Sequence, residues 1–275
     1  MPEQNFNVDA VYIGPPKSAS TWLWKCFKEH PDICVPKKLD STHYFTFRYK
    51  TKDLSWYEDL FSHRKDNQLC VDFCNNYLQS PKAVKRIAEH SPDVKILTGL
   101  RNPVDRAFSH YWHSKKKKTF PYDFKDVLER YNLYQTFIVP GFYRLHLRRY
   151  KRHFSDRQIF VQLYQNLQDN SKTYFESYLE FLGVSSFEPS LITNKVNEAG
   201  YKRNIPIRTI AAIGELVSRI GFSELADGVS HSRGLDFIKA LLSNKDEYEK
   251  GMSEDMKERL ELIYHDDLQQ LQKLP

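Results

Sequence analysis

The sequence predicts an α/β fold in which helices flank a central parallel β-sheet. Apolar runs of strand type alternate with helical patterns along the chain, and this alternation is typical of parallel sheets with crossover helices. The first apolar run leads into a glycine turn and then a helix, which is the layout of a phosphate-binding loop. With 275 residues, 40% of them hydrophobic, the chain can build one core. We therefore expect one domain over residues 1–275, mostly helical from about residue 205.

Cap residues delimit the predicted elements. Ser80 and Pro81 begin a helix as N-cap and first-turn proline, which is a common helix start. Asn102 and Pro103 open another helix directly after a strand that ends near Arg101. The expected strands cover residues 8–13, 70–73, 94–100 and 158–164.

The cysteines and the hydropathy pattern bear on metals and membranes. Cys70 and Cys74 are too widely spaced for a zinc knuckle and have no second Cys or His pair nearby, so we interpret them as buried small hydrophobes and expect no metal. No apolar run reaches the roughly 18 residues of a membrane span, and residues 1–8 lack a secretory h-region. Reduced thiols suit a soluble, cytoplasmic protein, which is our expectation. A truncated chain is the alternative.

The net charge of +6 suits anionic partners such as nucleotides, sulfated sugars or nucleic acid. The run Lys115–Lys118 has three interpretations: a solvated loop, which we favour, a rim for acidic substrates, or a nucleic-acid patch. Most aromatic residues have core spacing and no RNA-binding signature occurs, so nucleic acid is not an expected partner. In the basic helix over residues 142–154 we expect Phe142, Leu145 and Tyr150 to face inward.

The first group of candidate site residues is Lys17, Ser18, Ala19, Ser20 and Thr21, directly after the first strand. Backbone N–H groups at a helix start favour an anion, hydroxyls add donors, and a lysine adds a full charge. This pattern predicts a phosphate or sulfate cradle. A Walker A loop would require Gly at Ala19 and Lys at Ser20, so a nucleoside triphosphatase is disfavoured. The alternative is an ordinary capped helix, with Ser18 or Ser20 as N-cap and Lys17 in solvent.

The second group is Arg101, at the carboxyl end of a strand, and Ser109 on the following helix. Open parallel sheets bind ligands at the carboxyl ends of their strands. A guanidinium and a hydroxyl there can hold a second phosphate through charge-assisted hydrogen bonds. The alternative is a surface ion pair between Arg101 and Asp105.

Together these motifs resemble those of the sulfotransferases that use 3′-phosphoadenosine 5′-phosphosulfate (PAPS), in particular the carbohydrate branch with the heparan sulfate sulfotransferases and bacterial relatives. The stretch GPPKSASTWLWKCFKEHPDICVPK is similar to the family's 5′-phosphosulfate loop and following helix, and TGLRNPVDRAFSHYW is similar to its 3′-phosphate motif. The later stretches FVQLYQNL, YLEFLGV and RLELIYHDDLQQL also match, so the resemblance covers almost the whole chain.

The resemblance implies roles for individual residues. Lys17 would contact the 5′-phosphosulfate and its bridging oxygen, while Arg101 and Ser109 would hold the 3′-phosphate. The other loop residues at the donor would be Ser18, Ala19, Ser20, Thr21 and Trp22. A further loop over the nucleotide would contribute Tyr201, Lys202 and Arg203.

The resemblance leaves the catalytic base open. In the carbohydrate branch a Glu usually stands two residues before a motif like His-Tyr-Phe, but here that position is Ser41, with Asp40 one step earlier. Asp40 and His43 are the candidates, since the cytosolic branch uses a His base, and we rank Asp40 slightly ahead. The alternative is that His43 packs beside Tyr44 and Phe45 while Asp40 caps a turn.

The sequence differs from the family's pattern at a second place, which bears on the acceptor. The lysine of the family's acidic-Lys-Thr-Pro-x-Tyr motif is replaced here by Phe73, which favours a less polar pocket. We therefore expect sulfuryl transfer from PAPS, with 3′-phosphoadenosine 5′-phosphate (PAP) as product and no metal, to a hydroxyl or amine of a small molecule. An oligosaccharide acceptor is the alternative, and a noncatalytic nucleotide or polyanion binder is the alternative of another class. The oligomeric state stays open.

Overall fold

The computed structural model describes residues 6–37, 41–115, 120–192 and 252–271. The chain divides into two compact units. The first comprises residues 1–99, 149–162 and 166–196, and the second comprises residues 100–148, 163–165 and 197–275. The expectation of one domain over the whole chain stays a prediction, and the segment expected to be helical from about residue 205 lies outside the described residues as far as residue 251.

A five-stranded sheet in the order β2-β3-β1-β4-β5 forms the centre of the fold. Parallel ladders join β1 to β3, β1 to β4, and β2 to β3. All three residues of β1 are buried, as expected of a central strand covered on both faces. The short β2 was not predicted, because two residues are too few for a periodic signal. The strands are β1 (Ala10–Tyr12), β2 (Ile33–Cys34), β3 (Leu69–Phe73), β4 (Lys95–Leu100) and β5 (Ile159–Leu163).

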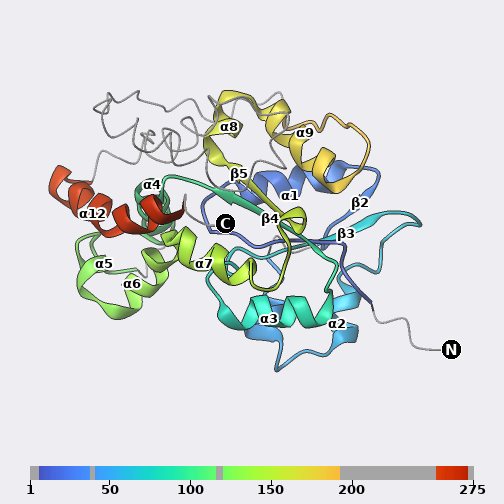
Figure 1. The fold of residues 1–275 in the computed structure, drawn as a ribbon, viewed down its shortest axis with the longest axis horizontal. Helices are drawn as coiled ribbons and strands as arrows, with labels where there is room; N and C mark the ends of the chain where they lie inside the picture. The colour runs from blue at the N-terminus through green and yellow to red at the C-terminus, as the bar shows by residue number, and fades with distance from the viewer. Residues whose placement is uncertain (1–5, 38–40, 116–119, 193–251, 272–275) are drawn as a thin grey trace. The chain divides into compact units, whose positions relative to one another are not determined.

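Helices cover both faces of the sheet in the first unit. In Figure 1, α1 (Ser20–Glu29) and α9 (Ser171–Leu182) lie on one side, and α2 (Leu54–Asp59) and α3 (Pro81–His90) lie on the other. Alternating side chains of β3 explain this arrangement, because successive residues of a strand point to opposite faces. The ring of Phe73 packs against Phe27 of α1, whereas the carboxylate of Asp72 accepts a hydrogen bond from Tyr57 of α2.

The predicted helix starts are confirmed by their caps. The hydroxyl of Ser80 accepts a hydrogen bond from the backbone N–H of Ala83, with Pro81 as first helical residue of α3. The side chain of Asn102 accepts from the backbone N–H of Val104 and so caps α4 (Pro103–Lys115). Both caps satisfy helix N–H groups that have no partner inside their own helix.

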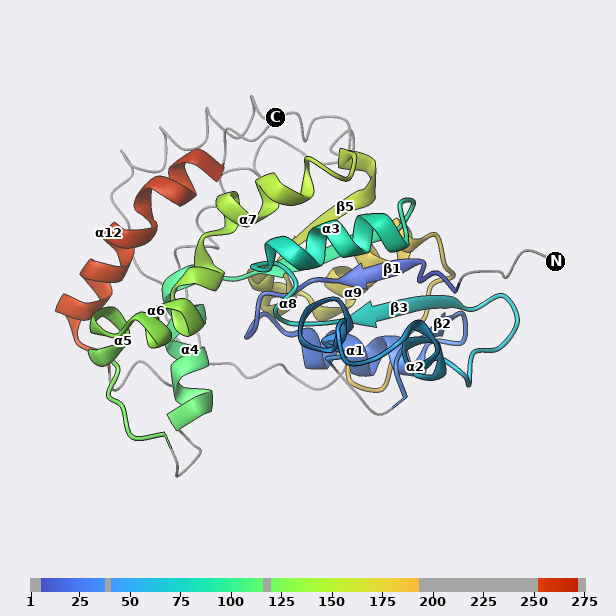
Figure 2. The ribbon, with the colours of Figure 1, turned by 90° about the horizontal axis from the view of Figure 1, so that it is seen from below.

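The second unit is helical in its described part and has a core of its own. Figure 2 shows α12 beside α4, α5 and α6, and buried side chains of all four form one apolar cluster that includes Phe108, Val127, Phe137 and Leu260. Gly141 permits close packing here, because a Cβ at that position would lie 2.7 Å from the ring of Tyr264. The remaining helices are α5 (Asp126–Glu129), α6 (Tyr131–Phe137), α7 (Tyr143–Tyr150), α8 (Tyr164–Asp169) and α12 (Glu254–Leu271), with short turns over Tyr44–Arg48, Val139–Gly141 and Asp156–Gln158.

The expected inward stripe of the basic helix is wrong at one position. Tyr150 is fully buried and Phe142 packs on Tyr264, but Leu145 is 46% exposed. Leu147 is buried instead. The helix begins at Tyr143 rather than at residue 142, and the first turn is aligned by Asp267, whose carboxylate accepts the backbone N–H groups of residues 144 and 145.

The cysteines of the chain are buried and unpaired, as predicted for Cys70 and Cys74. Among the described residues, no group of three or more His, Cys, Asp or Glu side chains is arranged to hold a metal ion. None of the helices in the described ranges is long and apolar enough to span a membrane.

Candidate active site

The loop between β1 and α1 has an unusual backbone. Lys17 and Ala19 both adopt left-handed conformations, with φ of 72° and 64°. Left-handed residues in a loop turn successive backbone N–H groups toward one side, and such nests bind anions. Ala19 is the N-cap of α1 and no side chain of the described residues caps this helix. The alternative of an ordinary helix capped by Ser18 or Ser20 is therefore wrong.

Two polar side-chain atoms, one in this loop and one in the first turn of α1, have no hydrogen-bond partner in the described part of the chain. The hydroxyl of Ser18 and the indole N–H of Trp22 are both buried without a hydrogen bond. A buried, unsatisfied donor costs roughly 1–3 kcal/mol, and a bound anion at the left-handed loop would satisfy the Ser18 hydroxyl. Both can donate to the oxygens of a phosphate or sulfate. The residues present thus fit the 5′-phosphosulfate group that the sequence motif implies.

The loop is held in place by the strands beneath it. The hydroxyl of Tyr12 donates to the backbone oxygen of Ser18 at 3.2 Å, and Thr98 of β4 donates to the backbone oxygen of Gly14. Gly14 has a φ of 96°, and a Cβ there would lie 2.3 Å from the backbone oxygen of Asn75. Only glycine fits this position, so the loop geometry follows from the close approach of the segment after β3.

The carboxyl ends of β1 and β4 are adjacent, because Tyr12 pairs with Leu97 in the parallel ladder. The two predicted groups of site residues therefore follow neighbouring strands of the sheet. Arg101, directly after β4, is only 6% exposed. Its guanidinium lies over the ring of Tyr164 at 4.7 Å from the centroid, and its backbone oxygen accepts from the hydroxyl of Tyr143 at 2.7 Å. The residue is therefore fixed at both its backbone and its side chain.

Ser109 lies on α4 and is 8% exposed. Asp105, the suggested partner in a surface ion pair, is 6% exposed. Since Arg101 and Asp105 are both buried, the interpretation as a solvent-exposed ion pair is wrong.

The segment after residue 40 carries the other candidate base. His43 has a left-handed φ of 55° and precedes the turn Tyr44–Arg48. Its ring nitrogen Nδ1 lies 3.1 Å from the side-chain oxygen of Asn76 and 3.3 Å from the sulfur of Cys74. The alternative of a histidine packed beside Tyr44 and Phe45 is incomplete, because the ring also has polar partners and packs on Phe47 with centroids 5.4 Å apart.

A buried carboxylate anchors this segment to the sheet. Asp72 of β3 accepts hydrogen bonds from the hydroxyls of Thr42 at 2.7 Å, Tyr57 at 2.9 Å and Tyr77 at 3.2 Å. Burial raises the pKa of Asp72 to about 6, and the three hydroxyl donors oppose that effect. The backbone N–H of Thr42 also donates to the oxygen of Phe73. Sequence analysis missed this network, although an acidic residue inside an apolar strand is a signal for one.

The ring of Phe73 lies in the core. It stacks on Tyr12 with centroids 5.2 Å apart and meets Phe27 edge-on, and the residue has no exposed surface. The expectation that this phenylalanine makes the acceptor pocket less polar therefore loses its support.

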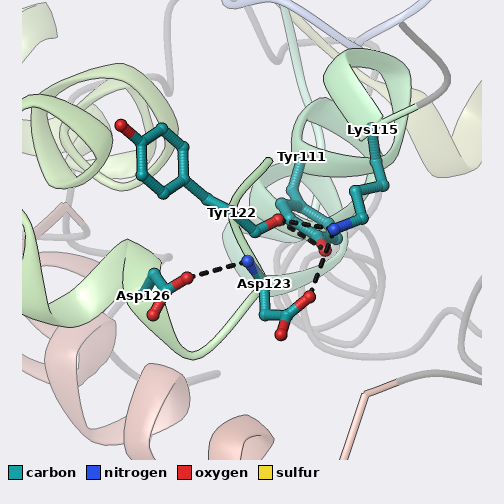
Figure 3. Close-up of polar contacts among 5 residues, drawn as sticks. All are labelled: Tyr111, Lys115, Tyr122, Asp123 and Asp126. Carbon is teal, nitrogen blue, oxygen red and sulfur yellow. Dashed lines mark hydrogen bonds and ion pairs between the residues drawn. The ribbon is translucent and has the colours of Figure 1, made fainter. Parts of the chain in front are cut away.

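Lys115, the first residue of the run Lys115–Lys118, contacts nearby residues through its ammonium group. The ammonium group of Lys115 donates to the backbone oxygen of Tyr122 and pairs with Asp123 at 3.1 Å, while the hydroxyl of Tyr111 reaches the same backbone oxygen (Figure 3). Asp126 accepts the backbone N–H of Asp123. Lys115 thus holds the segment after the run against α4 and is not part of a solvated loop.

Several predicted site residues lie outside the described part of the chain. They are Asp40, Lys116, Lys117, Lys118, Tyr201, Lys202 and Arg203.

The described part of the chain thus combines a parallel sheet, a helix start without a side-chain cap and a buried serine hydroxyl without a hydrogen-bond partner after the central strand. These features define an α/β protein with an anion-binding loop. The family model described as "Sulfotransferase domain" matches residues 8–273. The chain therefore belongs to the PAPS-dependent sulfotransferase family, as its motifs predicted.

Curated relatives include the bifunctional heparan sulfate N-deacetylase/N-sulfotransferase 4 of Mus musculus, which is 30% identical over 194 residues, 64% of this chain and 22% of the relative. The human N-deacetylase/N-sulfotransferase 3 is 29% identical over 63% of this chain and 22% of its own length. The chain matches about a fifth of the length of these relatives.

Solved structures support the fold. A sulfotransferase from Alicyclobacillus acidocaldarius has a TM-score of 0.61 at 21% identity, covering 88% of this chain and 98% of the other. A mouse sulfotransferase complexed with PAP has a TM-score of 0.54 at 16% identity, covering 97% of this chain and 88% of the other.

Proposed function

We propose that this protein transfers the sulfuryl group of PAPS to an amine or hydroxyl of a saccharide, with Lys17 at the donor and His43 as the base. The observation that carries the donor assignment is the buried hydroxyl of Ser18 in the left-handed loop after β1, which has no hydrogen-bond partner among the described residues. A saccharide is favoured over a small apolar acceptor for two reasons. The relatives at about 30% identity are named for heparan sulfate. The preference for an apolar acceptor assumed that Phe73 lines the acceptor pocket, but Phe73 is buried in the core.

Donor binding divides between two groups of residues. The loop from Lys17 to Trp22 binds the 5′-phosphosulfate through backbone N–H groups, hydroxyls and the lysine charge. Arg101 and Ser109 bind the 3′-phosphate, which distinguishes this nucleotide from plain adenosine phosphates. Support comes from the motif order and from the adjacency of the two strands that precede these groups.

PAPS supplies an activated sulfuryl group whose bond to the bridging phosphate oxygen can break. As the acceptor's nitrogen or oxygen forms its bond to sulfur, that bond breaks and PAP leaves with the electron pair. Lys17 stabilises the negative charge that develops on the leaving oxygen. A hydroxyl or a neutral amine loses one proton as its bond to sulfur forms, and His43 takes that proton, because a neutral hydroxyl is a poor nucleophile without a base.

His43 is preferred to Asp40 as base on the polar contacts of its ring with Asn76 and Cys74. These contacts hold an imidazole in a defined orientation, as general-base catalysis requires. Asp40, which lies outside the described residues, stays the alternative base.

Ligand binding separates this proposal from a noncatalytic polyanion binder. We expect PAP to raise the melting temperature without added metal, and to do so more than adenosine 5′-phosphate at the same concentration. Equal shifts for both nucleotides, or binding of any polyanion with a steep salt dependence, would favour the binder. Turnover is then measured with PAPS and two acceptor sets, deacetylated glucosamine-containing oligosaccharides and simple phenols. Sulfation of phenols alone would overturn the saccharide assignment.

A further inference from the structure

We infer that Asn76 is a positioning residue that fixes the tautomer of His43, so that Nδ1 carries the hydrogen and Nε2 carries the lone pair. The inference deepens the proposed function and rests on its assignment of His43 as base. The side-chain oxygen of Asn76 lies 3.1 Å from Nδ1 of His43. An amide oxygen only accepts hydrogen bonds, and a neutral imidazole has one N–H donor and one acceptor nitrogen.

The thiol of Cys74 determines which way the Asn76 amide faces. Its sulfur lies 2.8 Å from the Asn76 oxygen and donates to it. Burial raises the pKa of Cys74 to about 12, so the thiol keeps its hydrogen throughout the physiological range. Because the thiol is always a donor, the Asn76 amide turns its oxygen, and not its NH2 group, toward Cys74. Nδ1 of His43 faces the same oxygen and also lies 3.3 Å from the Cys74 sulfur. A hydrogen bond from the ring to the amide oxygen requires Nδ1 to carry the hydrogen.

The backbone around His43 limits rotation of the imidazole. The left-handed φ of 55° at His43 is a sparsely populated conformation for a non-glycine residue. Thr42, one residue earlier, is tied to β3 through its backbone N–H and its hydroxyl, and Arg48 donates to the backbone oxygen of Thr42 at 2.9 Å. On the other side the ring packs on Phe47. The imidazole is thereby held with Nδ1 toward Asn76.

A fixed tautomer matters because only the nitrogen with the lone pair can take a proton. A histidine whose other nitrogen is hydrogen-bonded to a carbonyl or carboxylate is locked in one tautomer, and this second contact decides its chemistry. Without Asn76 this contact would no longer favour the Nδ1–H tautomer, and the other tautomer would present an N–H to the acceptor. Asn76 therefore acts through His43 and does not itself touch the reacting atoms.

The tautomer can be read directly. Protein labelled with ¹⁵N-histidine is studied by long-range ¹H–¹⁵N correlation at about pH 8, where free imidazole is mostly neutral, and His43→Gln identifies the signal of His43. We expect Nδ1 to be protonated in the parent. Asn76→Leu should populate the Nε2–H tautomer and lower kcat roughly 10- to 100-fold, with PAP affinity unchanged. Asn76→Asp retains an acceptor and should restore the Nδ1–H tautomer. Cys74→Ala removes the donor that orients the amide but leaves the amide oxygen in place, so it should shift the tautomer less than Asn76→Leu does.

Three results would overturn the inference: a parent His43 whose Nδ1 carries no hydrogen, an Asn76→Leu variant with an unchanged tautomer, or a larger tautomer shift in Cys74→Ala than in Asn76→Leu. The parent spectrum alone decides the first case, even if Asn76→Leu does not fold. Failure of the proposed function looks different. If His43→Gln retains turnover, the assignment of His43 as base is wrong, whichever tautomer is observed. If His43→Gln is inactive but Asn76→Leu keeps both the parent tautomer and the parent rate, only the positioning role of Asn76 is wrong.

Discussion

Replacing Asp72 with asparagine removes a fully buried carboxyl from beneath the His43 segment and tests how burial controls its ionisation. In the folded protein the pKa of this carboxyl is raised from 3.8 to about 6, with burial as the main cause. The folded state therefore binds the proton more tightly than the unfolded chain between these values. The resulting contribution to stability is complete below the unfolded pKa of 3.8 and is lost as pH rises through about 6.

The size of the effect follows from the shift. A difference of about two pKa units corresponds to ~3 kcal/mol, at ~1.4 kcal/mol for each unit. Asp72 has no exposed surface, so solvent screening does not reduce this value. Asparagine cannot ionise, and its hydrogen bonds to Thr42, Tyr57 and Tyr77 do not change with pH. The free energy of unfolding of the variant relative to the parent should thus rise by ~3 kcal/mol between about pH 4 and pH 7.

The assay is urea unfolding of parent and variant at half-unit steps of pH, followed by tryptophan fluorescence. The absolute stability of Asp72→Asn depends on how well its amide fits three hydroxyl donors, so only the change with pH is interpreted. The exposed Asp66→Asn makes the same change of charge and controls for net charge. If Asp72→Asn and the parent have parallel pH profiles, the carboxyl is not perturbed by burial and the argument fails.

Three further substitutions test the donor site and its loop. Lys17→Ala should lower turnover by roughly 100-fold or more while leaving the melting temperature unchanged, and retained turnover would remove Lys17 from the mechanism. Gly14→Ala combines a left-handed φ with a Cβ 2.3 Å from the backbone of Asn75, whereas Gly183 has a φ of 77° and no neighbour within 4 Å. Gly14→Ala should therefore cost about 1–3 kcal/mol more than Gly183→Ala in urea unfolding, and equal losses would contradict the clash. Arg101→Ala should weaken PAP binding roughly 10- to 100-fold by calorimetry and leave adenosine 5′-phosphosulfate unaffected; equal losses for both ligands would argue against a 3′-phosphate contact.

The order of strands, caps and motifs could be predicted because each has a local signal. Alternating apolar and polar residues mark strands, and a period of about 3.6 residues marks helices. The pairs Ser80–Pro81 and Asn102–Pro103 mark helix starts, because the first residue of each pair caps its helix by a hydrogen bond to a backbone N–H two or three residues later. The Lys17 loop carries its own signature of residue types. These features depend on neighbours in the chain, so the sequence by itself determined the fold class, the family and the residues expected at the donor.

Other features depend on residues far apart in the sequence, and only the tertiary structure decided them. Ala19, not a serine, is the N-cap of α1, because the strands below hold the preceding loop in left-handed conformations. Phe73 and Asp72 are adjacent in the chain, yet one packs in the core and the other anchors the segment before His43. The contact of Asn76 with His43 joins residues more than thirty positions apart. No local pattern encodes such pairs, because they arise when separate strands and loops meet at one edge of the sheet.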